Sequence, residues 1–181
     1  MYKLLLLAAA LTPLFAAGEL SGRRAPGFSL VDLNLNYHDI QDLRGRVVLV
    51  EIMRTDCPHC QALAKNIEKL KVKFGPKIAV LSVVTPPDTQ ATVKQFIAQH
   101  GVTSPILFDC GQVAASYLKL DLLKPELHVP HLFLIDAQGM IRNDFAYNEQ
   151  TQPILLGDGL AAEVEKLLAP RPAAPQKKAT K

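Results

Sequence analysis

The sequence predicts an α/β domain in which strands and helices alternate in layers. Two short apolar runs rich in β-branched residues, Val47–Met53 and Lys77–Val84, are typical of buried strands. Each run is followed by a segment whose apolar residues recur at helical spacing. Nearer the C-terminus, Leu132–Asp136 and Met140–Phe145 flank Ala137-Gln138-Gly139 and predict a β-hairpin. This order of elements is that of a layered α/β domain.

The N-terminal elements are predicted from alternation and from helix signals. Phe28–Leu33 alternates as a half-buried strand, and Asn34–Tyr37 is expected to return as its hairpin partner. A turn or short helical piece is expected at Asp39–Leu43. A long helix is expected from Pro58 to the stop signal at Gly75; its apolar stripe comprises Leu63, Ile67, Leu70 and Phe74.

The C-terminal half continues the alternation. A second helix is expected between a cap at Asp88 and the stop at Gly101. The last helix is marked by apolar residues between Leu160 and Leu168. A short strand at Pro105–Asp109 and a helix at Gln112–Leu118 are expected between them.

The chain ends differ in composition from the domain. Residues 1–18 have a positive start at Lys3, an apolar core from Leu4 to Phe15 and small residues before a cleavage point, which is typical of a signal peptide. Residues 19–27 are interpreted as a linker and 28–168 as the domain. Residues 169–181 form a Pro/Ala/Lys tail expected to be disordered. Export implies an oxidising compartment in which disulfides persist.

The distribution of charge argues against nucleic-acid binding. The formal net charge is +3, but five of the 20 basic residues lie in the leader and the tail, and all 17 acidic residues lie between them. The remaining segment is therefore slightly acidic, and no basic face argues for nucleic acid. No later stretch is long and apolar enough to span a membrane, so anchoring after cleavage is not expected.

The sequence Cys57-Pro58-His59-Cys60 opens the long helix directly after the first apolar run. Pro58 suits the first helical turn, so Cys57 is placed at the helix N-terminus and Cys60 one turn further on. The unpaired N–H groups and the dipole of a helix start favour an anion, which predicts a reactive thiolate at Cys57. His59 can add a proton donor or a positive charge. The pair is expected to cycle between dithiol and disulfide, so no other cofactor is required.

Other readings of the two cysteines stay open. Half of a zinc site would need a second Cys/His pair, and the one remaining cysteine is Cys110. His131 could supply a third ligand to Cys57 and Cys60, which would make a copper binding or delivery module. A histidine at the pocket rim that tunes the thiolate is the preferred interpretation of His131, and Cys110 is interpreted as a buried thiol.

The sequence resembles the exported TlpA/ResA-like branch of the redoxins, which are thioredoxin-fold thiol–disulfide oxidoreductases. Four stretches carry the resemblance: 25–33, 43–50, the motif 57–60 and 129–139, which looks like the family's cis-proline strand and hairpin. The resemblance implies a thioredoxin-like fold: a central mixed sheet flanked by helices, with an N-terminal β-hairpin and an inserted αβ unit.

The resemblance also implies roles for individual residues. Pro130 is implied to be cis and to face the cysteine pair, so that Val129 presents its backbone to an incoming peptide, with Pro58 beside it. Glu51 lies six residues before Cys57, where relatives carry a buried acid, and is implied to exchange the proton of Cys60. Asp56 departs from the family, because an aromatic residue usually precedes the first cysteine. The Cys-Pro-His-Cys motif resembles the oxidising DsbA type.

The function expected is an exported, periplasmic bacterial protein-disulfide oxidoreductase that exchanges disulfides with protein substrates and a membrane or periplasmic redox partner. General disulfide formation and cytochrome c maturation are both open, and the sequence does not fix the direction of electron flow. A thiol peroxidase is a further alternative, although Thr55 stands two rather than three positions before Cys57.

Overall fold

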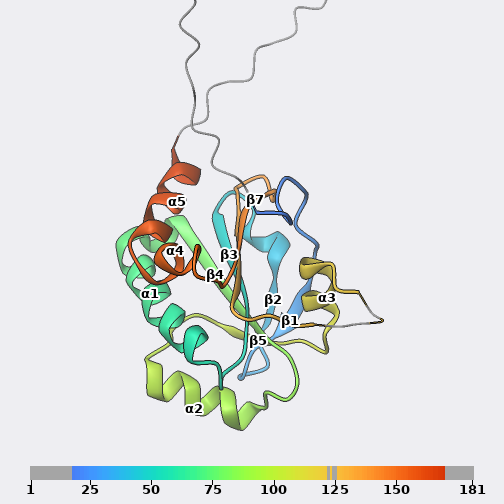
Figure 1. The fold of residues 1–181 in the computed structure, drawn as a ribbon. Helices are drawn as coiled ribbons and strands as arrows, with labels where there is room; N and C mark the ends of the chain where they lie inside the picture. The colour runs from blue at the N-terminus through green and yellow to red at the C-terminus, as the bar shows by residue number, and fades with distance from the viewer. Residues whose placement is uncertain (1–17, 122, 124–125, 170–181) are drawn as a thin grey trace, which may run out of the picture.

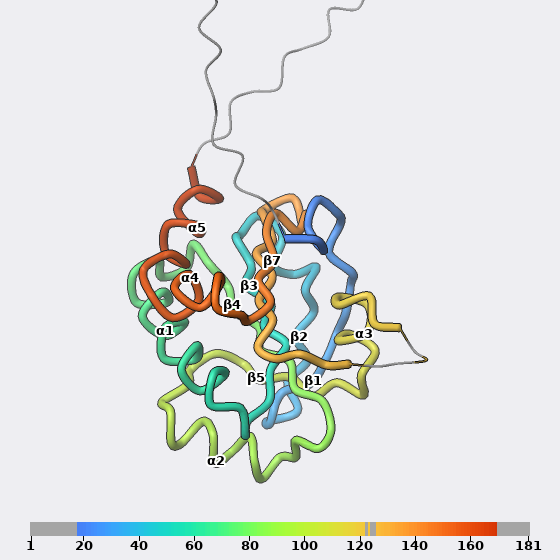
Figure 2. The backbone as a smooth tube through the Cα atoms, viewed as in Figure 1, coloured from blue at the N-terminus to red at the C-terminus, as the bar shows by residue number. Residues whose placement is uncertain are grey.

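The computed structural model describes residues 18–121, 123 and 126–169, and its centre is a mixed five-stranded sheet in the order β5-β4-β3-β6-β7 (Figures 1 and 2). Strand β3 lies in the middle, parallel to β4 and antiparallel to β6. The strands are β1 (Ser29–Val31), β2 (Tyr37–Asp39), β3 (Val47–Met53), β4 (Ile78–Val84), β5 (Ile106–Phe108), β6 (His131–Ile135) and β7 (Ile141–Ala146). Strands β1 and β2 form a separate antiparallel hairpin.

Helices cover both faces of this sheet. They are α1 (Pro58–Phe74), α2 (Gln90–His100), α3 (Gln112–Leu118), α4 (Gln152–Leu156) and α5 (Gly159–Leu168), with short 3-10 turns η1 (Ile40–Leu43) and η2 (Gly75–Lys77). In Figure 1, α1, α4 and α5 lie on one side of the sheet, and α3 lies on the other with the β1–β2 hairpin. None of the described helices is long and apolar enough to cross a bilayer.

Side-chain alternation along the strands separates the two cores. Val47 and Leu49 of β3 face α1 and α5, whereas Val48 and Val50 face α3. Every residue of β3 and β4 is buried, which explains why both read as continuous apolar runs. A third cluster joins α2 to the start of α1 and includes Cys60.

The predicted architecture is confirmed, and most boundaries agree within two residues. Residues 47–53 form a strand and residues 112–118 a helix, as predicted. The hairpin return is shifted, because β2 begins at Tyr37 rather than ending there. Helix α2 is capped by Thr89 instead of Asp88, through a reciprocal capping box with Thr92. Between β4 and β6 the chain forms α2, β5 and α3.

The predicted linker at residues 19–27 is part of the folded unit. Its backbone lies along the start of β7: Gly22 N–H donates to Ile141 O at 2.9 Å, and Ile141 N–H donates to Arg23 O at 2.8 Å. Arg24 forms an isolated bridge with Met140. Apart from Gly18 and Ala169, the predicted leader (1–18) and tail (169–181) fall outside the described residues.

Candidate redox site

The turn between β3 and α1 places Cys57 at the helix start. Pro58 is the first helical residue, and Cys57 is the N-cap, whose sulfur accepts the Cys60 N–H at 3.3 Å. The sulfur of Cys57 therefore occupies the position of a capping oxygen, where free N–H groups and the positive end of the helix dipole stabilise negative charge.

The two sulfurs lie in different environments. Cys57 is half-buried, whereas the side chain of Cys60 is fully enclosed between α1 and α2. Burial, reinforced by the charge of Glu51, raises the pKa of the Cys60 thiol. Both cysteines are thiols in this structure. The geometry gives one accessible sulfur and one protected sulfur a single helical turn apart.

Glu51 is a buried carboxyl group beneath the pair. It is 1% exposed in the middle of β3, and the hydroxyl of Ser82, its neighbour across the β3–β4 register, donates to Oε2 at 2.9 Å. Among the described residues, its Oε1 has no hydrogen-bond partner. Burial raises the pKa of Glu51 to about 7, against the hydrogen bond from Ser82. Glu51 can therefore both hold and release a proton near neutral pH.

The loop before β6 faces Cys57, as the resemblance implied. The Val129–Pro130 peptide bond is cis, and the Cys57 thiol donates to Val129 O at 3.8 Å. Pro130 O in turn accepts the Tyr147 N–H at 3.2 Å, which ties this loop to the end of β7. The backbone of Val129 therefore lies beside the accessible sulfur.

Polar contacts fix the turn that carries Cys57. Asp88 accepts the Thr55 N–H at 3.1 Å and also the Thr55 hydroxyl. The unusual Asp56 forms an ion pair with Arg54 at 2.6 Å, so part of its negative charge is offset before it can oppose a thiolate.

His59 is exposed, and its ring stacks on Tyr147. The ring centroids are 4.1 Å apart with an interplanar angle of 19°. Sequence patterns did not single out Tyr147, because it lies in irregular chain after β7 and is brought to the motif by tertiary folding.

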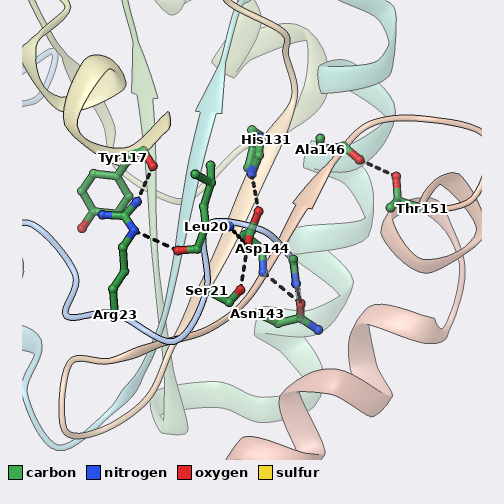
Figure 3. A network of polar contacts seen from close by, with 10 residues as sticks. Leu20, Ser21, Arg23, Tyr117, His131, Asn143, Asp144, Ala146 and Thr151 are labelled. Atoms are coloured by element: carbon green, nitrogen blue, oxygen red, sulfur yellow. Dashed lines mark hydrogen bonds and ion pairs between the residues drawn. The ribbon is translucent and has the colours of Figure 1, made fainter. Parts of the chain in front are cut away.

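His131 lies on the other face of the sheet from Cys60. Along β6, Leu132 and Leu134 face α1, whereas His131 and Phe133 point the opposite way and stack at 4.6 Å. Figure 3 shows His131 directed at Asp144 of β7, with Nε2 and Oδ2 3.0 Å apart. The expectations of a rim position and of a third metal ligand are therefore wrong.

Asp144 connects this histidine to the N-terminal segment. It also accepts the Leu20 N–H at 3.0 Å and the Ser21 hydroxyl at 2.6 Å (Figure 3). Burial alone would raise the pKa of Asp144, but the hydrogen bonds from His131 and Ser21 outweigh it and lower the pKa. The network stabilises the fold and explains why residues 18–21 are held against β7.

Cys110 is exposed, which corrects the expectation of a buried thiol. The buried residue at this turn is Asp109, whose Oδ2 accepts the N–H groups of Val113 and Ala114 at 3.0 Å each. Because Asp109 turns inward to cap α3, its neighbour Cys110 turns outward. No group of three or more His, Cys, Asp or Glu side chains that could hold a metal ion occurs among the described residues.

A family model provides the deciding comparison. The redoxin model matches residues 20–156, which include all the site residues above. The chain belongs to the redoxin family. Among redoxin relatives, it is 28% identical to the thioredoxin-like protein YneN of Bacillus subtilis over 128 residues, covering 70% of this chain and 71% of that protein. It is also 28% identical to the thiol-disulfide oxidoreductase ResA of Bacillus thuringiensis, with 75% of each chain covered.

Solved structures show the same fold for this redoxin. A thioredoxin-family thiol:disulfide interchange protein from Chlorobium tepidum superposes with a TM-score of 0.67 at 17% identity, covering 81% of this chain and 97% of the other. The thioredoxin domain of a thiol-disulfide oxidoreductase from Bacteroides vulgatus gives 0.64 at 21% identity, with 80% and 97% covered. The expectation of a TlpA/ResA-like redoxin with a thioredoxin-like fold is confirmed.

Proposed function

We propose that this redoxin is an exported protein-disulfide oxidoreductase that exchanges disulfides with protein substrates through Cys57 and Cys60. The observation that carries the proposal is the asymmetry of the pair: an accessible sulfur at a helix N-terminus, and a buried sulfur one turn behind it. The redoxin match and the ResA relatives, which are named thiol-disulfide oxidoreductases, support the same reaction class.

The reaction begins when the Cys57 thiolate attacks a substrate disulfide. One substrate sulfur leaves as a thiolate, and the other stays bound to Cys57 in a mixed disulfide. The Cys60 thiolate then attacks the Cys57 sulfur and releases the second substrate thiolate. The substrate gains two electrons and the pair becomes a disulfide; the reverse sequence oxidises a substrate dithiol. The pair itself thus serves as the redox group.

Glu51 is proposed to handle the proton of Cys60. The buried Cys60 thiol holds its proton tightly, so its attack needs a nearby base. Glu51 is buried near it, titrates near neutral pH and has one carboxyl oxygen without a hydrogen-bond partner in the part of the chain that the structure describes. In the reverse direction the protonated carboxyl group returns the proton to Cys60.

Val129, Pro130 and Pro58 are proposed to receive the substrate chain. Since the Val129 carbonyl lies 3.8 Å from the Cys57 sulfur, a peptide extended along this loop would bring its cysteine to Cys57. His59 is proposed to add a proton donor or positive charge on the exposed side of the motif.

Export to the periplasm is proposed from the leader-like residues 1–18, and it fits a reaction on protein disulfides, which persist in an oxidising compartment. Two alternatives lose support. The copper module lacks its third ligand, because His131 pairs with Asp144. The peroxidase lacks a free threonine hydroxyl, because Thr55 donates its own to Asp88.

Equilibration of the Cys110→Ser protein with glutathione redox buffers tests the proposal. We expect one reversible two-electron transition between dithiol and the Cys57–Cys60 disulfide, detected by alkylation and mass spectrometry. A potential near about −120 mV would assign disulfide formation, and one near about −270 mV would assign a reductive path such as the maintenance of apocytochrome thiols. A pair that never forms the intramolecular disulfide would overturn the proposal.

A further inference from the structure

Three segments that are distant in sequence contact one another around the redox motif. The Cys57 thiol contacts Val129 O, and the next carbonyl, that of Pro130, accepts the Tyr147 N–H at 3.2 Å. The Tyr147 ring then stacks on His59, two residues from Cys57. Tyr147 is therefore connected to both sides of the place where a substrate disulfide would react.

The two stacked residues differ in how firmly they are held. Tyr147 is anchored by its backbone hydrogen bond and packs, partly buried, against the core cluster of α1, α4 and α5. His59 is exposed on the first turn of α1. Among the described residues, the stack on Tyr147 is the one ring contact that His59 makes. The orientation of the imidazole is thus set by Tyr147 rather than the reverse.

The near-parallel stacking of the His59 and Tyr147 rings, 4.1 Å apart, has an electrostatic consequence. The electron-rich face of a phenol ring attracts a cation, so the Tyr147 ring can hold a charged imidazole in place. A positive charge beside the N-terminus of α1 stabilises the thiolate of the reduced pair, whereas the neutral disulfide gains nothing from it. A contact that holds a protonated imidazole there favours the dithiol form and makes the disulfide more oxidising.

We infer that Tyr147 is a positioning residue that holds His59 beside the Cys57–Cys60 pair and thereby shifts the pair toward its reduced form. The inference rests on the proposed function, since it concerns the equilibrium of that same pair. In this inference Tyr147 acts through His59 rather than on the reacting sulfurs.

The test compares equilibrium constants for the reaction of the dithiol with oxidised glutathione, which yields the protein disulfide and two reduced glutathiones. All variants carry Cys110→Ser, so that the exposed third thiol cannot form adducts. Tyr147→Leu keeps an apolar side chain and the backbone N–H but removes the ring, and Tyr147→Phe keeps the ring. Tyr37→Leu is the matched control, because Tyr37 is 77% exposed on the remote hairpin.

Tyr147→Leu is expected to raise the equilibrium constant for disulfide formation by about two- to fivefold, the size expected for an exposed cation–π contact. Tyr147→Phe and Tyr37→Leu should stay at the parent value. In a His59→Ala background, Tyr147→Leu should have no further effect, because the residue it positions is gone.

The outcomes separate this inference from the proposed function. A parent protein that never forms the Cys57–Cys60 disulfide in glutathione would overturn both. If the parent cycles normally but Tyr147→Leu leaves the constant unchanged, or changes it equally with His59→Ala present, the positioning role is overturned and the proposed function stands.

Discussion

Replacing Cys60 with serine is expected to stop the reaction at the mixed disulfide. In the Cys60→Ser variant, Cys57 keeps its place at the start of α1 and still attacks a substrate disulfide, but no second sulfur can release the adduct. Incubating the reduced variant with a disulfide-bonded peptide should therefore accumulate a covalent 1:1 adduct, measured by intact mass spectrometry. The parent protein should show only a transient trace of it.

The controls for this trap use the other two cysteines. All proteins are prepared with Cys110→Ser, because that exposed thiol could itself capture peptide. Cys57→Ser should form essentially no adduct, since Cys60 is fully buried. Adduct formation through Cys60 at a rate comparable to that through Cys57 would contradict the assignment of attacker and resolver.

The Glu51→Gln variant is expected to lose a pH dependence of stability that the parent protein has. The pKa of Glu51 rises from an ordinary value of 4.5 to about 7 on folding, so the folded protein binds this proton more tightly than the unfolded chain. The contribution of Glu51 is fully present below pH 4.5 and is lost as the pH rises through about 7. The loss amounts to about 3 kcal/mol of unfolding free energy.

Urea unfolding of both proteins between pH 4.5 and 8 measures this effect. The quantity to compare is the difference in unfolding free energy between the two proteins at each pH, because the contributions of groups common to both proteins cancel in it. Gln resembles the protonated carboxyl group and can still accept from the Ser82 hydroxyl, so the two proteins should be closest in stability at the acidic end. Curves that run parallel across the whole range would show that Glu51 does not titrate in this window.

The Glu51→Gln variant also distinguishes an effect on stability from an effect on proton transfer. With Gln at position 51 the first attack by Cys57 should keep its rate, whereas resolution by Cys60 should slow by about 100-fold or more, the usual contribution of a positioned base. A loss confined to the second step cannot come from general unfolding, which would affect both steps.

The regular elements around the site could be predicted because local signals and tertiary structure agree there. The β-branched run 47–53 is buried on both faces, and Pro58 at the first helical position marks the start of α1. The contact between Glu51 and Ser82 could also have been predicted from the sequence. Each is the polar residue in an otherwise apolar strand, and the strands are neighbours in the sheet.

His131 and Cys110 were assigned to the wrong environments, and both errors show the limits of local sequence patterns. His131 could have been assigned to the far face, because strand alternation puts it opposite Leu132 and Leu134, but proximity to Pro130 in sequence suggested the pocket instead. The orientation of Cys110 depends on whether Asp109 turns inward to cap α3, which no periodicity reveals. Helix α4 is five residues long, too short for a recognisable stripe.

Contacts distant in sequence were the least predictable part of the site. Tyr147 reaches His59 across almost 90 residues of sequence, and Asp88 holds Thr55 across 33. Such contacts follow from the sheet order and loop paths, which the sequence signals define only at the level of topology.

The alkylation rates of Cys57 and Cys60 test the central claim most directly. Reduced, native Cys110→Ser protein is treated with limiting iodoacetamide at neutral pH, and modification of each cysteine is followed by peptide mass spectrometry. Cys57 should react at least about 100 times faster than Cys60, because Cys60 is fully buried and must wait for local opening. Equal rates, or faster modification of Cys60, would contradict the division between an accessible attacking sulfur and a protected resolving sulfur.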